Sequence, residues 1–138
     1  MVITESVKFS TRGNGEIVDI TEEVARKVAD SELKDGTVTI FSPSATSSLT
    51  TVEYESGLVH DLQDLFDRVA PHDIDYRHNL RWGDGNGHSH VRAALFGASL
   101  TVPFVDKRLT LGTWQQIAFL DFDVRPHNRE LVLQMIGE

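Results

Sequence analysis

Hydrophobic and polar residues alternate along much of this chain with the two-residue period that is typical of β-strands. Residues 2–10 follow the period of a strand with one buried face. Residues 131–136 alternate as well, but both of their faces are largely apolar, which predicts a central strand or one covered in an oligomer. Other runs are rich in β-branched and aromatic residues and predict strands just after an Asn-Gly turn at 14–15 and at 37–41, 47–55, 99–105 and 108–124.

Two further segments have the spacing of amphipathic helices, and a third suits a short helix. Residues 19–36 carry one apolar stripe, and we expect Thr21 to cap the start of this helix and Gly36 to end it. A second helical pattern lies at 57–71, and residues 90–97 suit about two further turns. Runs of strands with two to three helices between them predict a mostly antiparallel α+β domain.

The composition is that of an ordinary globular protein, with 40% hydrophobic and 25% charged residues in a chain of 138, so we expect one domain over residues 1–138. A formal net charge of -8 without a cluster of Lys or Arg argues against nucleic acid and anionic membranes as partners. The absence of cysteine excludes disulfides, zinc–thiolate sites and cysteine nucleophiles. The chain shows no signal-peptide pattern and no apolar run of membrane-spanning length, so we expect a cytoplasmic protein.

Three histidines, His78, His88 and His90, fall close together around a glycine-rich stretch. Neutral imidazole is the commonest metal ligand in proteins, so this stretch is a candidate site for one divalent ion, Zn, Mg or Mn. Residues two apart point to the same side only in an extended chain, so the hypothesis requires residues 88–90 to be extended. The glycines match neither a dinucleotide-binding nor an EF-hand loop. The alternative interpretation is a glycine-rich turn whose histidines lie at the surface.

Two further segments carry groups that suit a phosphorylated ligand. Residues 42–51 are rich in hydroxyl groups, so Ser44 and Thr46 are candidates for holding a phosphate, although a plain strand with a hydroxyl-rich turn explains the same residues. No G-x-S-x-G elbow is present, which argues against a serine nucleophile. Trp114 and Gln115 follow a glycine and suit stacking on, and hydrogen bonding to, a heterocycle, while the alternative for Trp114 is to fill a core or an interface.

Six runs of the chain together resemble the YjbQ-like family, the secondary thiamine-phosphate synthases. They follow one another over nearly the whole chain, and they are TSSLTTVEYE, DYRHN, GNGHSH, GASLTVPF, RLTLGTWQQI and RELVLQMIGE. The resemblance implies an α+β, sandwich-like β-sheet domain that forms homotrimers and has a histidine-rich, metal-associated site. The polar residues that match the family's pattern are Asp61, His78, Asp84, His90, Trp114, Gln115 and Arg129.

The chain departs from this family pattern at one position. Many members have a histidine where this chain has Ser44, and we expect His88 to compensate as a metal ligand. Among the candidate catalytic residues, we expect Asp61 to hydrogen-bond a site histidine and hold its orientation. Asp84 lies in the histidine-rich stretch itself, and we expect Arg129 to meet a phosphate oxygen with its planar guanidinium.

The activity that the resemblance implies joins a pyrimidine-methyl pyrophosphate to a thiazole phosphate and expels pyrophosphate. Such a reaction needs a divalent cation or positive donors at the pyrophosphate, and stacking surfaces for the heterocycles. Two other functions fit the same residues. One is metal-assisted hydrolysis by a histidine-bound water, and the other is a non-catalytic trimeric protein that binds a metal or a small molecule.

Overall fold

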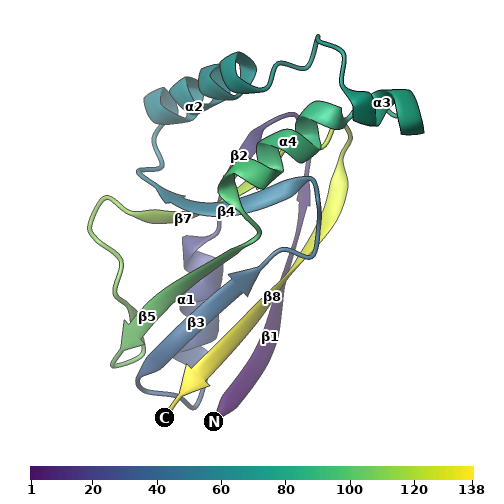
Figure 1. The fold of residues 1–138 in the computed structure, drawn as a ribbon. Helices are drawn as coiled ribbons and strands as arrows, with labels where there is room; N and C mark the ends of the chain where they lie inside the picture. The colour runs from purple at the N-terminus through teal and green to yellow at the C-terminus, as the bar shows by residue number, and fades with distance from the viewer.

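The computed structural model describes residues 1–138, which form two antiparallel β-sheets and four helices (Figure 1). The strands are β1 (Val2–Thr11), β2 (Glu16–Asp19), β3 (Gly36–Phe41), β4 (Ser47–Val52), β5 (Ser99–Val105), β6 (Arg108–Leu109), β7 (Gln116–Asp121) and β8 (His127–Gly137). The helices are α1 (Thr21–Asp30), α2 (Ser56–Val69), α3 (Arg77–Trp82) and α4 (Gly87–Phe96). The predicted α+β class and antiparallel pairing are confirmed. None of the four helices combines the length and the apolar character needed to cross a membrane.

The larger sheet has the strand order β1-β8-β3-β5-β6, and the smaller sheet has the order β2-β7-β4. β8 pairs with β1 on one side and with β3 on the other, so the prediction of a central strand at the C-terminus is confirmed. Leu131, Leu133 and Met135 on one face of β8 are fully buried. On its other face Ile136 is 54% exposed, because no helix covers that side of the strand.

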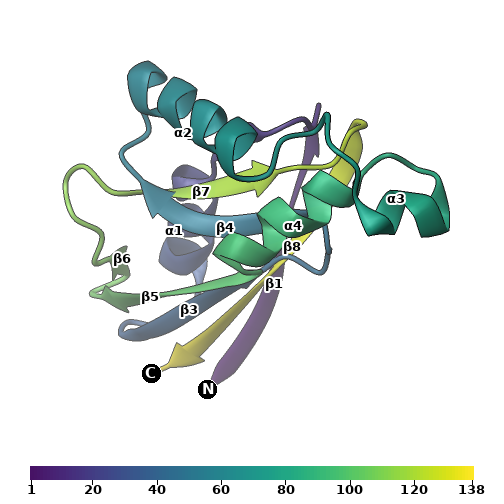
Figure 2. The ribbon, with the colours of Figure 1, turned by 45° about the horizontal axis from the view of Figure 1, so that its top comes forward.

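Two apolar cores lie on opposite faces of the smaller sheet. The main core fills the space between the two sheets and includes the buried face of α1, whereas α2 and α4 cover the outer face of the smaller sheet (Figure 2). Ile117 and Phe119 of β7 point into the main core, and Ala118 and Leu120 point into the second one. Burial on both faces explains why this strand has a continuous apolar sequence instead of an alternating one.

The start and the end of α1 differ from the prediction. Thr21 is the first residue of the helix and not its cap. Its hydroxyl donates to Asp19 Oδ1 at 2.6 Å and accepts from the backbone N–H of Ile117 at 2.9 Å, so it ties the helix to β7. The helix ends at Asp30, and Gly36, which we expected to end it, is the first residue of β3.

Two other predictions are corrected in the second half of the chain. The strand expected over 108–124 is interrupted, since only its first two residues and Gln116–Asp121 pair with other strands. α3 was not predicted, and its six residues include none that is buried, so no apolar stripe identified it. Asp106 and Lys107 form the turn between β5 and β6, and both have positive φ, 49° and 65°, as a tight hairpin requires.

Candidate functional site

Several of the predicted polar residues meet at one end of the sheets. The loop between β3 and β4, the end of β7, the start of β8 and the first turn of α4 come together there (Figure 1). Ser44 and Thr46 lie in the loop, and both accept hydrogen bonds from Arg129 of β8. Ser44 also lines a hollow whose other wall contains His90 of α4. The fold therefore joins segments that are 85 positions apart in the sequence.

Arg129 is held by Asp121, which is not among the predicted site residues. Its Nε and Nη2 donate to the two oxygens of Asp121, each at 2.8 Å, in a bidentate pair. Its Nη1 donates to Ser44 Oγ at 3.0 Å and its Nη2 to Thr46 Oγ1 at 3.2 Å. The prediction that its guanidinium fork meets a phosphate is therefore corrected, because Asp121 already occupies the fork. Arg129 instead fixes the positions of the two hydroxyl groups.

The charge of Asp121 depends on these bonds. Asp121 is fully buried, and burial by itself would raise its pKa. Hydrogen bonds from Arg129 and Thr11, together with the positive charge of Arg129, outweigh that effect and hold the pKa of Asp121 below its ordinary value. The buried pair is therefore ionised, and the two charges compensate each other.

A second carboxylate, Asp123, lies two residues farther along the chain. Its Oδ2 is 2.6 Å from His127 Nε2 and accepts a long hydrogen bond from Thr46 at 3.4 Å. Burial would raise the pKa of Asp123, but hydrogen bonds from the N–H of Val124 and from His127 lower it further than burial raises it. Asp121 and Asp123 alternate at the end of the apolar run that forms β7, and this alternation is the sequence signal that could have identified the two carboxylates.

His78 and His90 form the closest pair of imidazoles. Their ring centroids are 4.4 Å apart, with His78 on α3 and His90 on α4. Asp84 Oδ1 is 3.6 Å from His78 Nδ1, and this nitrogen is buried and has no hydrogen-bond partner. The two short helices are joined by the N–H of Gly87, which donates to Asn79 Oδ1 at 2.8 Å.

The hollow beside His90 has a volume of about 330 Å³. Ser44 and Ser47 contribute hydroxyl groups to its wall, while alanine side chains and Gly97 supply an apolar surface. A cavity with a few polar groups on an apolar lining is typical of small-molecule sites. The predicted phosphate-holding residue Ser44 and the predicted metal ligand His90 therefore face the same space.

His88 does not join this pair. Residues 87–96 are helical, so the expectation of an extended chain at residues 88–90 is wrong, and side chains two apart on a helix diverge. His88 is 5% exposed and its ring lies 6.1 Å from that of His72. Burial lowers its pKa, and the charge of Arg92 lowers it further. No three His, Asp or Glu side chains in the structure gather closely enough to hold a metal ion, so the three-histidine arrangement is not assembled within one chain.

Trp114 and Gln115 lie at the opposite end of β4. Gln115 Nε2 donates to Thr51 Oγ1, whereas the hollow beside His90 begins at Ser47. Four strand residues separate these positions by roughly 13 Å. Both ribbon views place the loop between β6 and β7 on the far side of the molecule from α3 (Figures 1 and 2). The predicted ring-binding residues therefore do not line the histidine site of their own chain, and Trp114 is 73% exposed.

Asp61 also lies apart from the histidine pair. It is exposed on α2, and no hydrogen bond joins it to a histidine. The nearby His60 instead pairs with Asp64, at 3.4 Å. The expectation that Asp61 orients a site histidine therefore has no contact to support it within the chain.

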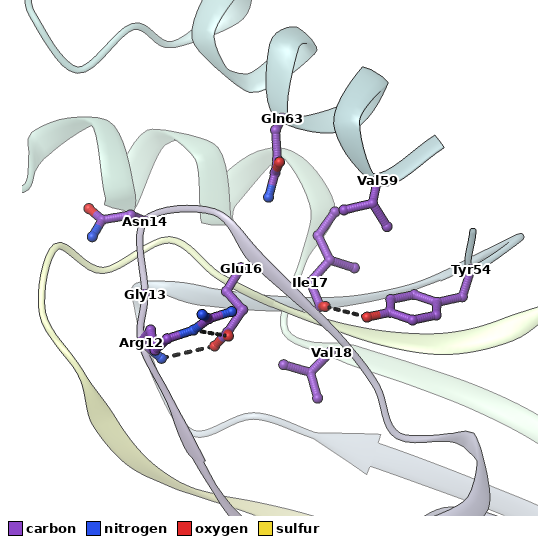
Figure 3. A pocket seen from close by; sticks show the side chains of 9 residues that line it. All are labelled: Arg12, Gly13, Asn14, Glu16, Ile17, Val18, Tyr54, Val59 and Gln63. Atoms are coloured by element: carbon purple, nitrogen blue, oxygen red, sulfur yellow. Dashed lines mark hydrogen bonds and ion pairs between the residues drawn. The ribbon is translucent and has the colours of Figure 1, made fainter. Parts of the chain in front are cut away.

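The largest cavity, of about 570 Å³, contains none of the predicted site residues (Figure 3). It lies between α2 and β2, and several of its polar groups are already paired inside the protein. Arg12 Nε donates to Glu16 at 2.8 Å, the Tyr54 hydroxyl donates to Ile17 O at 3.2 Å, and Gln63 donates to the backbone. Size alone therefore does not identify the functional site.

Comparison with known proteins places the whole chain in one family. Residues 5–138 match the family described as UPF0047 protein YjbQ-like. A UPF0047 protein of Methanothermobacter thermautotrophicus is 35% identical over 137 residues, which cover 99% of this chain and 94% of that protein. The UPF0047 protein YugU of Bacillus subtilis is 32% identical, over 96% of this chain and 98% of the relative.

Solved structures agree with the fold. The crystal structure of a YbjQ-like protein of unknown function from Sulfolobus solfataricus superimposes with a TM-score of 0.89 at 28% identity, covering 100% of both chains. A YjbQ/UPF0047 protein from Clostridium acetobutylicum gives a TM-score of 0.83 at 31% identity, over 94% of this chain and 99% of that one. The resemblance noted in six runs of the sequence thus extends to the complete fold, and the chain belongs to the YjbQ-like UPF0047 family.

Proposed function

We propose that this protein is a metal-associated enzyme that acts on a phosphorylated heterocycle in the hollow between α4 and the loop before β4. The observation that carries the proposal is the His78–His90 pair, whose ring centroids lie 4.4 Å apart beside that hollow. The buried Nδ1 of His78 has no hydrogen-bond partner in the chain, since Asp84 Oδ1 is 3.6 Å away, and a buried polar atom without a hydrogen bond costs free energy. A ligand at this position would satisfy it.

The electrostatics of the chain favour a cation as part of this ligand. The formal net charge is -8, and the one arginine that reaches the hydroxyl groups is neutralised by Asp121. A phosphate would therefore meet little positive charge from the protein alone. The imidazoles of His78 and His90 would suit a Zn ion, whereas Mg or Mn would need further oxygen ligands from the phosphate groups of the substrate. A bound ion would supply positive charge where pyrophosphate departs.

The side chains of the hollow match the rest of the ligand. Arg129 donates to the oxygen of Ser44, so that the Ser44 hydroxyl proton can be donated to a phosphate oxygen. Ala93 and Ala94 on α4, and Ala98 just after it, leave space for a flat ring. These features support a transfer resembling that of the secondary thiamine-phosphate synthases, in which the thiazole phosphate replaces pyrophosphate on the pyrimidine-methyl carbon.

Calorimetric titration with zinc, manganese and magnesium tests the metal part of the proposal. We expect wild type to bind one ion per chain, and His78→Ala or His90→Ala to lose at least about tenfold in affinity, because each removes one of two ligands. His60→Ala is the matched control, since His60 is exposed on α2. Wild type that binds none of the three ions, or unchanged affinity in both variants, would contradict the proposal.

Incubation with a pyrimidine-methyl pyrophosphate and a thiazole phosphate then separates the candidate reactions. Formation of the joined product that depends on His78 and His90 supports the transferase. Release of phosphate without the joined product identifies metal-assisted hydrolysis instead. Metal binding without any turnover identifies a binding protein and overturns the enzymatic part of the proposal.

A further inference from the structure

A second polar cavity lies on the opposite side of the first turn of α4. Its volume is about 210 Å³, and its walls come from the loop after β1, the last turns of α2, the segment after α2, and α4. Its lining residues are Asn14, Asp67, His72, His88 and Arg92, without any apolar side chain. None of them belongs to the histidine pair or to the hydroxyl-lined hollow.

Arg92 is the central group of this cavity. It is 5% exposed, which is unusual for a guanidinium, because burial of a charge is costly unless the charge is paired. Its Nε donates to Ala70 O at 2.9 Å, and its Nη2 donates to Asp67 at 3.1 Å. The side chain of Asp67 is 64% exposed, so this partner is partly screened by water. Nη1 makes no hydrogen bond within the protein, which leaves donors of a buried cation unused.

Two histidines face each other across the same space. His88 is 5% exposed, and its buried Nδ1 has no hydrogen-bond partner. His72, whose ring is 6.1 Å from that of His88, is exposed at the mouth. Each imidazole offers an N–H donor in its neutral form as well as in its charged form. Asn14 adds an amide from a loop that is fixed by its own backbone N–H, which donates to Asp123 O at 2.7 Å.

These groups select an anion and not a cation. The one carboxylate in the lining, Asp67, is already paired with Arg92, and the guanidinium repels a metal ion. An oxyanion has several acceptor oxygens and can take hydrogen bonds from an arginine, two imidazoles and an amide at once. The cavity is also several times larger than the volume of about 30 Å³ that one water takes in the liquid, so it has room for a tetrahedral group.

We propose that this cavity, which we name the Arg92 cavity, binds a phosphate group through Arg92, His72, His88 and Asn14. It is a second anion site, separated from the proposed reaction site by the first turn of α4. His88 and His90 point to different sides of that turn, His88 into the Arg92 cavity and His90 into the hollow of the reaction site. A phosphate in the Arg92 cavity therefore holds the same helix that carries His90. The proposal does not depend on metal binding at the histidine pair.

Calorimetry with inorganic phosphate in the presence of a chelator tests this site alone, because the chelator removes any metal-held phosphate. We expect binding to wild type, with His72→Gln raising Kd about tenfold through the loss of one charge-assisted bond. Asp67→Asn should lower Kd several-fold, because it removes the competing carboxylate and leaves Arg92 free. An increase in affinity is a result that general damage to the fold does not produce. His60→Gln is the control, and it should bind as wild type does.

Three further arms define the ligand and separate the two sites. Glycerol phosphate is titrated in place of inorganic phosphate. If it binds with the lower Kd, the natural ligand is an organic phosphomonoester, and if inorganic phosphate does, the ligand is the free ion. In NMR spectra, the chemical shifts of the His72 and His88 ring protons should change during the titration. His90→Ala should keep this binding while it loses the metal. Absence of binding by both phosphates, or unchanged Kd in both His72→Gln and Asp67→Asn, would overturn the proposal.

Discussion

Asp121 and Arg129 form the buried ion pair around which the candidate site is arranged. The carboxylate is fully buried, and the guanidinium side chain is 11% exposed. A buried pair adds little stability compared with apolar residues, but removal of one partner leaves an uncompensated charge in the interior. The two hydroxyl groups beside the hollow depend on this pair, since Arg129 donates to Ser44 and Thr46.

Asp121→Asn should lower the free energy of unfolding by about 3–5 kcal/mol at neutral pH, because Arg129 would remain buried without its counter-charge. Urea denaturation followed by circular dichroism measures the change. Glu130→Gln is the matched control, since this neighbouring residue on β8 is exposed, and its effect should stay within about 0.5 kcal/mol.

The same pair gives the direction of the pH dependence. The pKa of Asp121 is lower in the folded protein than in the unfolded chain. Its stabilising contribution is therefore present above the unfolded value of about 3.9 and is lost as the pH falls through the folded value. The difference between wild type and Asp121→Asn should shrink in acid. An equally large difference at all pH values would show that the carboxylate charge is not the cause.

At the scale of elements, the position of His78 depends on how α3 packs against α4. α3 has no buried residue, so its own packing does not hold it in place. The contact is made at Gly87, where a Cβ would lie 2.5 Å from Tyr76 Cβ and 3.0 Å from Asn79 Oδ1. Only glycine lets α4 approach Tyr76 and Asn79 this closely, which explains one glycine of the glycine-rich stretch between His78 and His88.

Gly87→Ala should separate α3 from α4 and leave the sheets intact. We expect faster backbone hydrogen exchange in residues 77–82, and a zinc affinity reduced at least about tenfold because His78 leaves His90. Global stability should change little, since α3 contributes no side chain to either core. Gly112→Ala is the control: its nearest neighbour would be 3.7 Å away in a flexible side chain. Unchanged exchange in α3 would mean that the helix is held by other contacts.

At the scale of the whole molecule, one face of the larger sheet is left without a covering layer. Val2, Phe41 and Ile136 on β1, β3 and β8 are 59%, 43% and 54% exposed. Val2 and Ile136 lie opposite each other, whereas Phe41 is paired with Val132 farther along β3. Exposed apolar side chains on an uncovered sheet face suit a protein–protein contact. Trp114, 73% exposed at the other end of β4, also has too little surrounding structure to serve its own chain as a binding residue.

The family resemblance implies a homotrimer, and the uncovered sheet face offers a surface for its contacts. We expect Trp114 and Gln115 of one subunit to reach the histidine site of the next. Light scattering should give three times the mass of one chain, and Ile136→Glu should reduce it, while Val69→Glu on exposed α2 should not. Co-refolding of Trp114→Ala with His90→Ala should restore thiazole phosphate binding that neither variant shows alone, because mixed trimers contain intact sites. A monomer at micromolar concentration, or no restoration in mixed trimers, would contradict this arrangement.

Local patterns determined the elements of this protein. The alternation over Leu131–Ile136 identified a central strand, and the apolar stripes identified α1 and α2, because these periods reflect which side of a backbone is buried. The helical turns expected at 90–97 cover most of α4. Ser44, His78, His90 and Arg129 were selected from residue chemistry and from the family resemblance. That selection needed no knowledge of which residues touch.

The tertiary structure alone decided how those residues combine. Arg129 meets Asp121 and Ser44 because β7, β8 and the loop before β4 come together, and no local period records that contact. His88 turns away from His90 because the helix begins at Gly87, where the packing against α3, and not helix propensity, sets the boundary. The sequence thus determined which strands, helices and reactive groups exist, and three-dimensional packing determined which of those groups share a site, because side-chain contacts between distant segments depend on how the layers close on one another.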